Sequence, residues 1–188
     1  MRQLIVLCMG ILVLGGCTSV VDSVTSEPIV ADPASTSAGT YYNDRKMDTF
    51  IGVNIKKAHP DLDASHINVS VAKAVVLLTG EVPSREMKIL AGDTARDFTG
   101  VRLVHNELQV RGKTSIVSRT NDSVITAKIK TKLAFEEQVK AINIDVITED
   151  SVVYLMGTID RVSGDLAADI ASASGGVRKV VKVFEYID

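Results

Sequence analysis

Two stretches of the chain repeat one another, and this repeat limits the possible folds more than any other feature. The segments 67–80 and 144–157 align without gaps, and their closing glycines, Gly80 and Gly157, stand 77 residues apart. Further along, Gly-Val-x-x-Val recurs at 100–104 and 176–180. A two-copy repeat of about this length favours two small globular modules over a solenoid, which needs at least three shorter units.

The two modules share one predicted order of elements: helix, strand, strand, helix, strand. In module two, Ile125, Ile129 and Leu133 recur at i, i+4 and i+8 and mark the core face of its first helix. Asn121-Asp122-Ser123 supplies N-cap candidates for this helix, and Glu149-Asp150 a tight turn. The predicted ranges are 122–135, 142–148, 151–158, 163–174 and 177–187 in module two, and 45–58, 66–72, 75–82, 84–98 and 101–110 in module one. Two helices on one face of a three-stranded sheet form an α+β sandwich of two layers.

Four glycines occupy matching places in the two modules, and we interpret them as structural. Gly80 and Gly157 are expected to end strands where the chain bends, and Gly100 and Gly176 to cap helices. The sequence contains no Gly-x-Gly-x-x-Gly or Walker-type loop. The glycines therefore give no support to a phosphate-binding loop.

The N-terminus carries a targeting signal. Arg2 precedes an apolar run over residues 4–14, which is shorter than the roughly 20 residues of a membrane-spanning helix. Small residues and then Cys17 follow, in the order Leu-Gly-Gly-Cys. This order resembles the lipobox of bacterial lipoproteins, which implies cleavage after residue 16 and a lipid on Cys17. The alternative is an ordinary signal peptide followed by an incidental cysteine.

The amino-acid composition separates a tether from the two modules in the rest of the chain. Between Thr18 and Asp44 there are four acidic residues and no Lys or Arg, in a stretch rich in Ser, Thr, Ala and Pro. This composition predicts a disordered tether, so that the lipidated cysteine and tether occupy 17–44. The modules are then assigned to 45–112 and 121–188, with a linker over 113–120. A net charge of −2 gives no case for nucleic-acid binding.

The repeated motifs resemble those of the BON domain. Leu78-Thr79-Gly80-Glu81-Val82 and Leu155-Met156-Gly157-Thr158-Ile159 carry the first motif, and the Gly-Val-x-x-Val strands carry the second. Two such domains behind a lipobox are similar to dual-BON outer-membrane lipoproteins associated with cell division and envelope stress. The resemblance implies a periplasm-facing protein of the outer membrane that binds anionic phospholipid, such as phosphatidylglycerol or cardiolipin. It further implies support of outer-membrane integrity without catalysis.

The residue types that usually carry catalysis or bind metal show no useful spacing. His59, His66 and His105 lack metal-ligand spacing, and with Cys17 lipidated no thiolate is left for a zinc site. Asp165 and Asp169 form an i, i+4 pair on a helix, where carboxylates are usually solvated. We therefore expect no catalytic residues, no metal and no cofactor.

The first helix of module two has a second stripe that its core does not require. Val124, Lys128, Thr131 and Phe135 recur at i, i+4, i+7 and i+11, with Lys132 on the flank. Apolar side chains between lysines suit a membrane interface, where ammonium groups meet lipid phosphates. The stripe therefore predicts binding of anionic phospholipid by this helix.

Two alternatives to this lipid site stay open at this point. In the first, Phe135 folds back into the core or the domain interface, and the lysines are a solvated face. In the second, the modules are a protein–protein adaptor for outer-membrane assembly or cell-wall machinery, with the edges or an open face of the sheets as docking sites.

Overall fold

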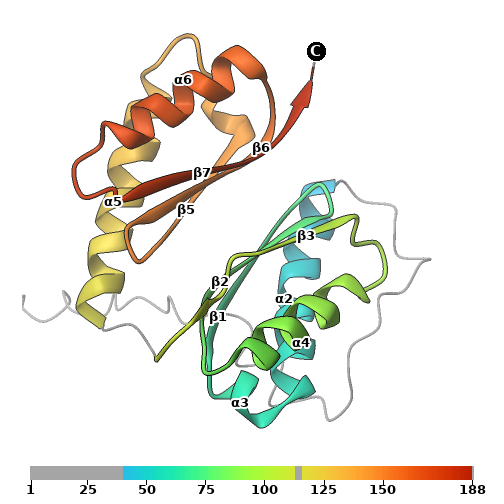
Figure 1. The fold of residues 1–188 in the computed structure, drawn as a ribbon. Helices are drawn as coiled ribbons and strands as arrows, with labels where there is room; N and C mark the ends of the chain where they lie inside the picture. Colours follow the sequence, from blue (N-terminus) through green and yellow to red (C-terminus); the bar gives the residue numbers. More distant parts are fainter. Residues whose placement is uncertain (1–39, 113–115, 188) are drawn as a thin grey trace, which may run out of the picture.

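The computed structural model describes residues 40–112 and 116–187, which fold into two modules of the same design (Figure 1). The predicted signal peptide, Cys17 and most of the tether lie outside the described residues. Helix α2 begins at Thr40 and helix α5 at Ile116, inside the ranges assigned to tether and linker. No Gly or Pro interrupts 40–44 or 116–121, so nothing stops either helix from extending this far.

Module one adds a short helix to the predicted order. Pro60 stands in the first turn of this helix, and the side chain of His59 accepts a hydrogen bond from the Asp61 amide at 3.1 Å. The elements are α2 (Thr40–Ala58), α3 (Pro60–Asp63), β1 (His66–Ala72), β2 (Val75–Val82), α4 (Arg85–Arg96), β3 (Leu103–Asn106) and β4 (Gln109–Val110). Strands β3 and β4 are two parts of the third predicted strand, because both pair with β2 in one parallel register.

Module two follows the predicted order with shifted boundaries. Its elements are α5 (Ile116–Ala134), a 3-10 turn η2 (Ala141–Asn143), β5 (Ile144–Glu149), β6 (Val152–Asp160), α6 (Arg161–Ser172) and β7 (Lys179–Ile187). The N-cap candidates Asn121-Asp122-Ser123 lie inside α5, so that prediction is wrong. The hairpin turn is Asp150-Ser151, one residue later than expected, because Glu149 still pairs with Val152.

Each sheet has its second strand in the centre. Strand β2 pairs antiparallel with β1 and parallel with β3, and β6 pairs in the same way with β5 and β7. The two longer helices of each module cover one face of its sheet and enclose a separate apolar core. The expected α+β fold of two repeated modules is confirmed. Among the described residues, no helix is long and apolar enough to cross a membrane.

Gly80 and Gly157 lie inside the central strands rather than at their ends. Their φ angles are +115° and +145°, where L side chains are rarely found. A Cβ atom at either position would stand 2.0 Å from a backbone oxygen, that of His66 or of Asn143. These positions therefore require glycine because the neighbouring backbone approaches too closely for any side chain.

Gly100 and Gly176 do not cap the helices that precede them. Helices α4 and α6 end in the cap residues Asp97 and Ala173, which keep negative φ angles. The glycines come later, in the turn toward the third strand, with φ of +93° and +97°. Their place in the turn, rather than at the helix end, corrects the sequence interpretation.

The two sheets pack against each other through the faces that the helices leave open (Figure 1). Val75 and Leu77 of β2 form one apolar cluster with Tyr154 and Met156 of β6 and Val183 of β7. These side chains are at most 5% exposed. Helices, sheet, sheet and helices thus form four layers, with the contact between the modules in the middle.

Candidate membrane-binding surface and the seam between the modules

Helix α5 presents one face to the core and another to solvent. Ile125, Ile129 and Leu133 are at most 1% exposed, which confirms the predicted core stripe. On the other face, the side chain of Val124 is 46% exposed and that of Phe135 is 84% exposed. The alternative in which Phe135 folds back into the core or the domain interface is therefore wrong.

The polar residues of the outer stripe are exposed too. Lys128, Thr131 and Lys132 all face solvent. The Thr131 hydroxyl donates to the Ala127 carbonyl at 2.9 Å, a bond within the helix. The Lys132 ammonium donates at 2.9 Å to the hydroxyl of Ser174, which follows α6. The structure therefore brings the five predicted lipid-binding residues to one exposed side of α5.

A groove of about 470 Å³ adjoins the end of this stripe. It lies between the last turn of α5 and the second half of α6. Its lining is Thr131, Lys132, Phe135, Glu136, Ile170 and Ala173. Aliphatic and aromatic carbon next to an ammonium group is the chemistry that suits a lipid with a charged headgroup.

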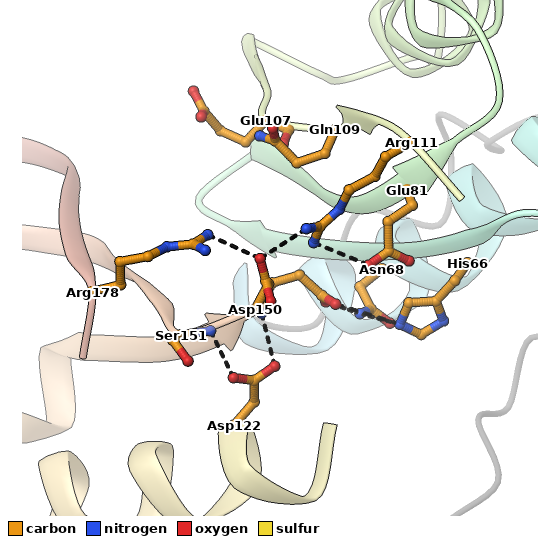
Figure 2. Close-up of polar contacts among 11 residues, drawn as sticks. His66, Asn68, Glu81, Glu107, Gln109, Arg111, Asp122, Asp150, Ser151 and Arg178 are labelled. Carbon is orange, nitrogen blue, oxygen red and sulfur yellow. Dashed lines mark hydrogen bonds and ion pairs between the residues drawn. The ribbon is translucent and has the colours of Figure 1, made fainter. Parts of the chain in front are cut away.

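A second polar cluster, missed by the sequence analysis, lies where the modules meet. We call it the seam; it consists of His66, Asn68, Glu81, Arg111, Glu149, Asp150 and Arg178 (Figure 2). Asp150 accepts hydrogen bonds from Arg111 of module one and Arg178 of module two, both at 2.9 Å. Burial acts to raise the pKa of Asp150, but the two guanidinium groups outweigh it and lower that pKa.

Two carboxylates of the seam are buried, one from each module. Glu149 is 7% exposed and accepts from the Asn68 amide at 2.8 Å, while its other oxygen is 3.8 Å from His66 Nε2. Glu81 is 1% exposed and accepts from Arg111 at 3.4 Å through one oxygen only. Burial raises the pKa of Glu149, and the nearby charge of Glu81 adds to this.

The seam is connected to α5 through the hairpin turn of module two. The Asp122 carboxylate of α5 accepts the backbone N–H groups of Asp150 and Ser151 at 2.7 Å and 2.8 Å (Figure 2). The residue that pairs with Arg111 is therefore also held by the candidate lipid-binding helix.

Two further candidates for chemistry make structural contacts. His59 caps α3, and Asp165 forms an ion pair with Lys182 at 2.8 Å. Among the described residues, no group of three or more His, Cys, Asp or Glu side chains could hold a metal ion.

Comparison with known proteins decides the family. The model of the BON domain matches the chain twice, over residues 51–112 and 121–188. The chain belongs to the BON family. The two BON domains coincide with the two structural modules, each with one sheet and its helices. BON domains are associated with membrane or phospholipid binding.

Several known proteins resemble the chain over most of its length. It is 32% identical to the outer membrane lipoprotein DolP of Haemophilus influenzae, over 100% of this chain and 97% of that protein. It is 34% identical to the 21 kDa hemolysin of Actinobacillus pleuropneumoniae, over 80% and 78%. It is 33% identical to the osmotically-inducible protein Y of Escherichia coli, over 71% and 69%. These similarities confirm the expected outer-membrane lipoprotein with two BON domains.

Proposed function

We propose that this BON protein faces the periplasm, binds anionic phospholipid through helix α5 and thereby supports outer-membrane integrity without catalysis. The observation that carries the proposal is the 84% exposure of Phe135 at the end of a lysine-bearing helix face. Phe135 lines one groove with Ile170 and Ala173, and a contiguous apolar surface of this kind marks an interaction site. A membrane interface offers an apolar partner to this surface, and lipid phosphates offer partners to Lys128 and Lys132.

The binding free energy expected from α5 is that of a weak site, which works together with an anchor that already holds the protein at the membrane. Each lysine near an anionic surface contributes about 1 kcal/mol, so two or three of them give only weak binding. A lipid on Cys17 would keep the protein at the bilayer and give α5 a high effective concentration there. The anchor would hold the protein in the membrane, and α5 would select the lipids that surround it.

The experiment measures binding of fragment 40–188 to vesicles of phosphatidylcholine with and without phosphatidylglycerol or cardiolipin. This fragment holds every described residue of the three apolar clusters. Phe135→Asp with Lys128→Glu should weaken binding to anionic vesicles by about tenfold or more.

A matched control changes the charge equally on the other module. Ile89 is 54% exposed on α4, and Arg85 is exposed one turn before it. Ile89→Asp with Arg85→Glu should therefore leave binding close to that of the wild type. Equal binding by the wild type and the α5 double variant would refute the assigned site.

A second candidate function is a protein adaptor. Strands β1 and β5 are edge strands of their sheets, and both line one groove of about 630 Å³ between the modules. An extended segment of an outer-membrane assembly or cell-wall protein could add to such an edge. Recovery of one stoichiometric partner protein, together with no binding to anionic vesicles, would favour this function over lipid binding.

A further inference from the structure

Apolar side chains gather at one end of module two. Eight large apolar side chains are exposed in the part of the chain that the structure describes, and three of them exceed 75% exposure. These three are Phe135 after α5, Ile142 in η2 at 96% and Val162 in the first turn of α6 at 77%. None of the three lies in module one, and only Phe135 belongs to the outer stripe of α5.

The topology places these three residues at the same end. Strand β5 starts where β6 and β7 finish, because Ile144 pairs with Gly157 and Asp160 with Ile187. Helix α6 starts directly after β6. The Asp122 contact fixes the earlier part of α5 at the opposite end, by the Asp150-Ser151 turn, so α5 ends on the side where β6 ends (Figure 1).

Contacts tie the segments of this end together. The Ser163 hydroxyl of α6 donates to the Gln138 carbonyl at 3.0 Å, which holds the loop after Phe135 against the helix that carries Val162. Ile142 lines one groove with Lys130 and with Ile187, which is itself 54% exposed. Lys140 and Arg161 are exposed on the same segments. The end of module two is thus an apolar tip with charged side chains beside it, the basic Lys140 and Arg161 and the acidic Glu137.

The chain that leads to the lipid anchor joins the fold at this end. Asp44 and Asp48, in the first half of α2, line the same groove as Ile142 and Ile187. The described part of α2 begins at Thr40, and 22 residues separate it from Cys17. The chain that comes from the lipid anchor therefore enters the described fold beside the apolar tip.

We propose that module two meets the membrane end-on, with Phe135, Ile142 and Val162 entering the phospholipid headgroup region. This inference rests on the proposed lipid-binding function. It places the membrane contact at the C-terminal end of α5 rather than in the middle of that helix. Val124 lies eleven residues before Phe135, so about 16 Å of helix separates it from the tip. End-on contact leaves Val124 outside the apolar layer.

A lipid surface fits this tip better than a protein partner. A stable protein–protein interface uses about 20–30 residues from each side, packed over a continuous area. Three protruding side chains on three separate segments fall far short of that number. A membrane interface requires only that apolar tips reach the acyl boundary while nearby cations stay among the headgroups.

The absence of tryptophan from the sequence makes a direct test possible. Single tryptophans at positions 124, 135, 142 and 162 would be placed in the full-length lipidated protein in phosphatidylglycerol-containing vesicles. Phe135→Trp, Ile142→Trp and Val162→Trp should give blue-shifted emission that brominated acyl chains quench. Val124→Trp should show less of both effects, and the control Ile89→Trp on module one neither.

The outcomes separate this inference from the proposed function. Quenching of Phe135→Trp and Val124→Trp, with Ile142→Trp and Val162→Trp in water, would overturn end-on contact and keep binding through α5. Quenching at none of the four positions would overturn both. A blue shift at Ile142→Trp and Val162→Trp without vesicles would mean that a second copy of the protein covers the tip, and would overturn the inference.

A second measurement tests the energy of the contact with the α5 stripe intact. Ile142→Asp with Val162→Asp in fragment 40–188 should weaken binding to anionic vesicles by about tenfold. Both side chains are largely in water, so circular dichroism should show an unchanged fold. Unchanged binding by this folded variant would refute the inference.

Discussion

Asp44 of α2 and Asp122 of α5 make the same contact in the two modules. Each carboxylate is buried and accepts both backbone N–H groups of a hairpin turn, over 2.7 and 3.1 Å for Asp44 and 2.7 and 2.8 Å for Asp122. The turn residues all have φ between 48° and 63°, a conformation that glycine or asparagine usually supplies. The buried aspartate therefore stabilises a turn made without glycine.

We predict that Asp122→Ala destabilises module two by about 2 kcal/mol or more. Two N–H groups would lose a charged acceptor, and each such loss costs about 1–3 kcal/mol. Asp122→Asn keeps one acceptor oxygen but turns an NH₂ donor toward the other N–H group, so it should also destabilise the module, by about 1 kcal/mol or more. Thermal unfolding of fragment 40–188, followed by circular dichroism, would measure the difference. An Asp122→Ala variant as stable as the wild type would show that the turn does not depend on α5.

The glycine of the central strand gives a second prediction. Gly157→Ala should destabilise the fragment by about 3 kcal/mol or more, because the new Cβ would stand 2.0 Å from the Asn143 carbonyl at a positive φ. Gly175→Ala is the matched control, since no atom lies within 4 Å of its Cβ. If the two variants unfold at the same denaturant concentration, the close approach at Gly157 is not a constraint.

The local sequence pattern predicted most of the fold but not the solvent exposure of Phe135. The spacing of Ile125, Ile129 and Leu133 fixed the core face of α5, because burial follows the helical period. Helix α5 ends at Ala134, so Phe135 lies past the last helical residue and the period says nothing about its direction. Ile142 and Val162 of the tip were not predicted for a related reason. Ile142 stands in a 3-10 turn and Val162 at the start of a helix, where the helical period gives no direction for the side chain.

The seam could not be predicted from local pattern because it depends on how two modules face each other. Arg111 and Asp150 are 39 residues apart and belong to different modules. A signal for part of it was present, however. Asp44 and Asp122 stand 78 residues apart, close to the 77 of the repeat, and each is an acidic residue near the start of its module. A repeated buried acid of this kind indicates a shared backbone contact.

The lipid anchor gives a third prediction, about residues outside the described structure. Cys17→Ser should release the protein from the membrane fraction, because the acyl chains contribute about 0.8 kcal/mol per buried CH₂ and the protein site is weak. Cys8→Ser is the control, since Cys8 lies in the segment expected to be cleaved, and it should leave retention unchanged. Full membrane retention of Cys17→Ser would overturn the lipobox interpretation.

The fourth prediction concerns the pH dependence of the seam. Burial raises the pKa of Glu149 above its ordinary 4.5, and Glu81 and Asp122 raise it further, against the Asn68 hydrogen bond and the charge of Arg119. A carboxyl whose pKa is raised by folding stabilises the fold most when it is protonated. Its contribution is therefore complete below about pH 4.5 and is lost as the pH rises through the higher folded-state pKa.

Glu149→Gln should consequently be more stable than the wild type at pH 7, and this advantage should shrink as the pH falls toward 4.5. The glutamine carbonyl can still accept the Asn68 amide, while the buried negative charge next to Glu81 is gone. Asp145→Asn is the control, because it removes an exposed carboxylate from the same strand without a contact to the seam. Urea unfolding of fragment 40–188 at several pH values would measure both variants. A Glu149→Gln variant that is less stable than the wild type at pH 7 would show that the ionised carboxylate holds the two modules together.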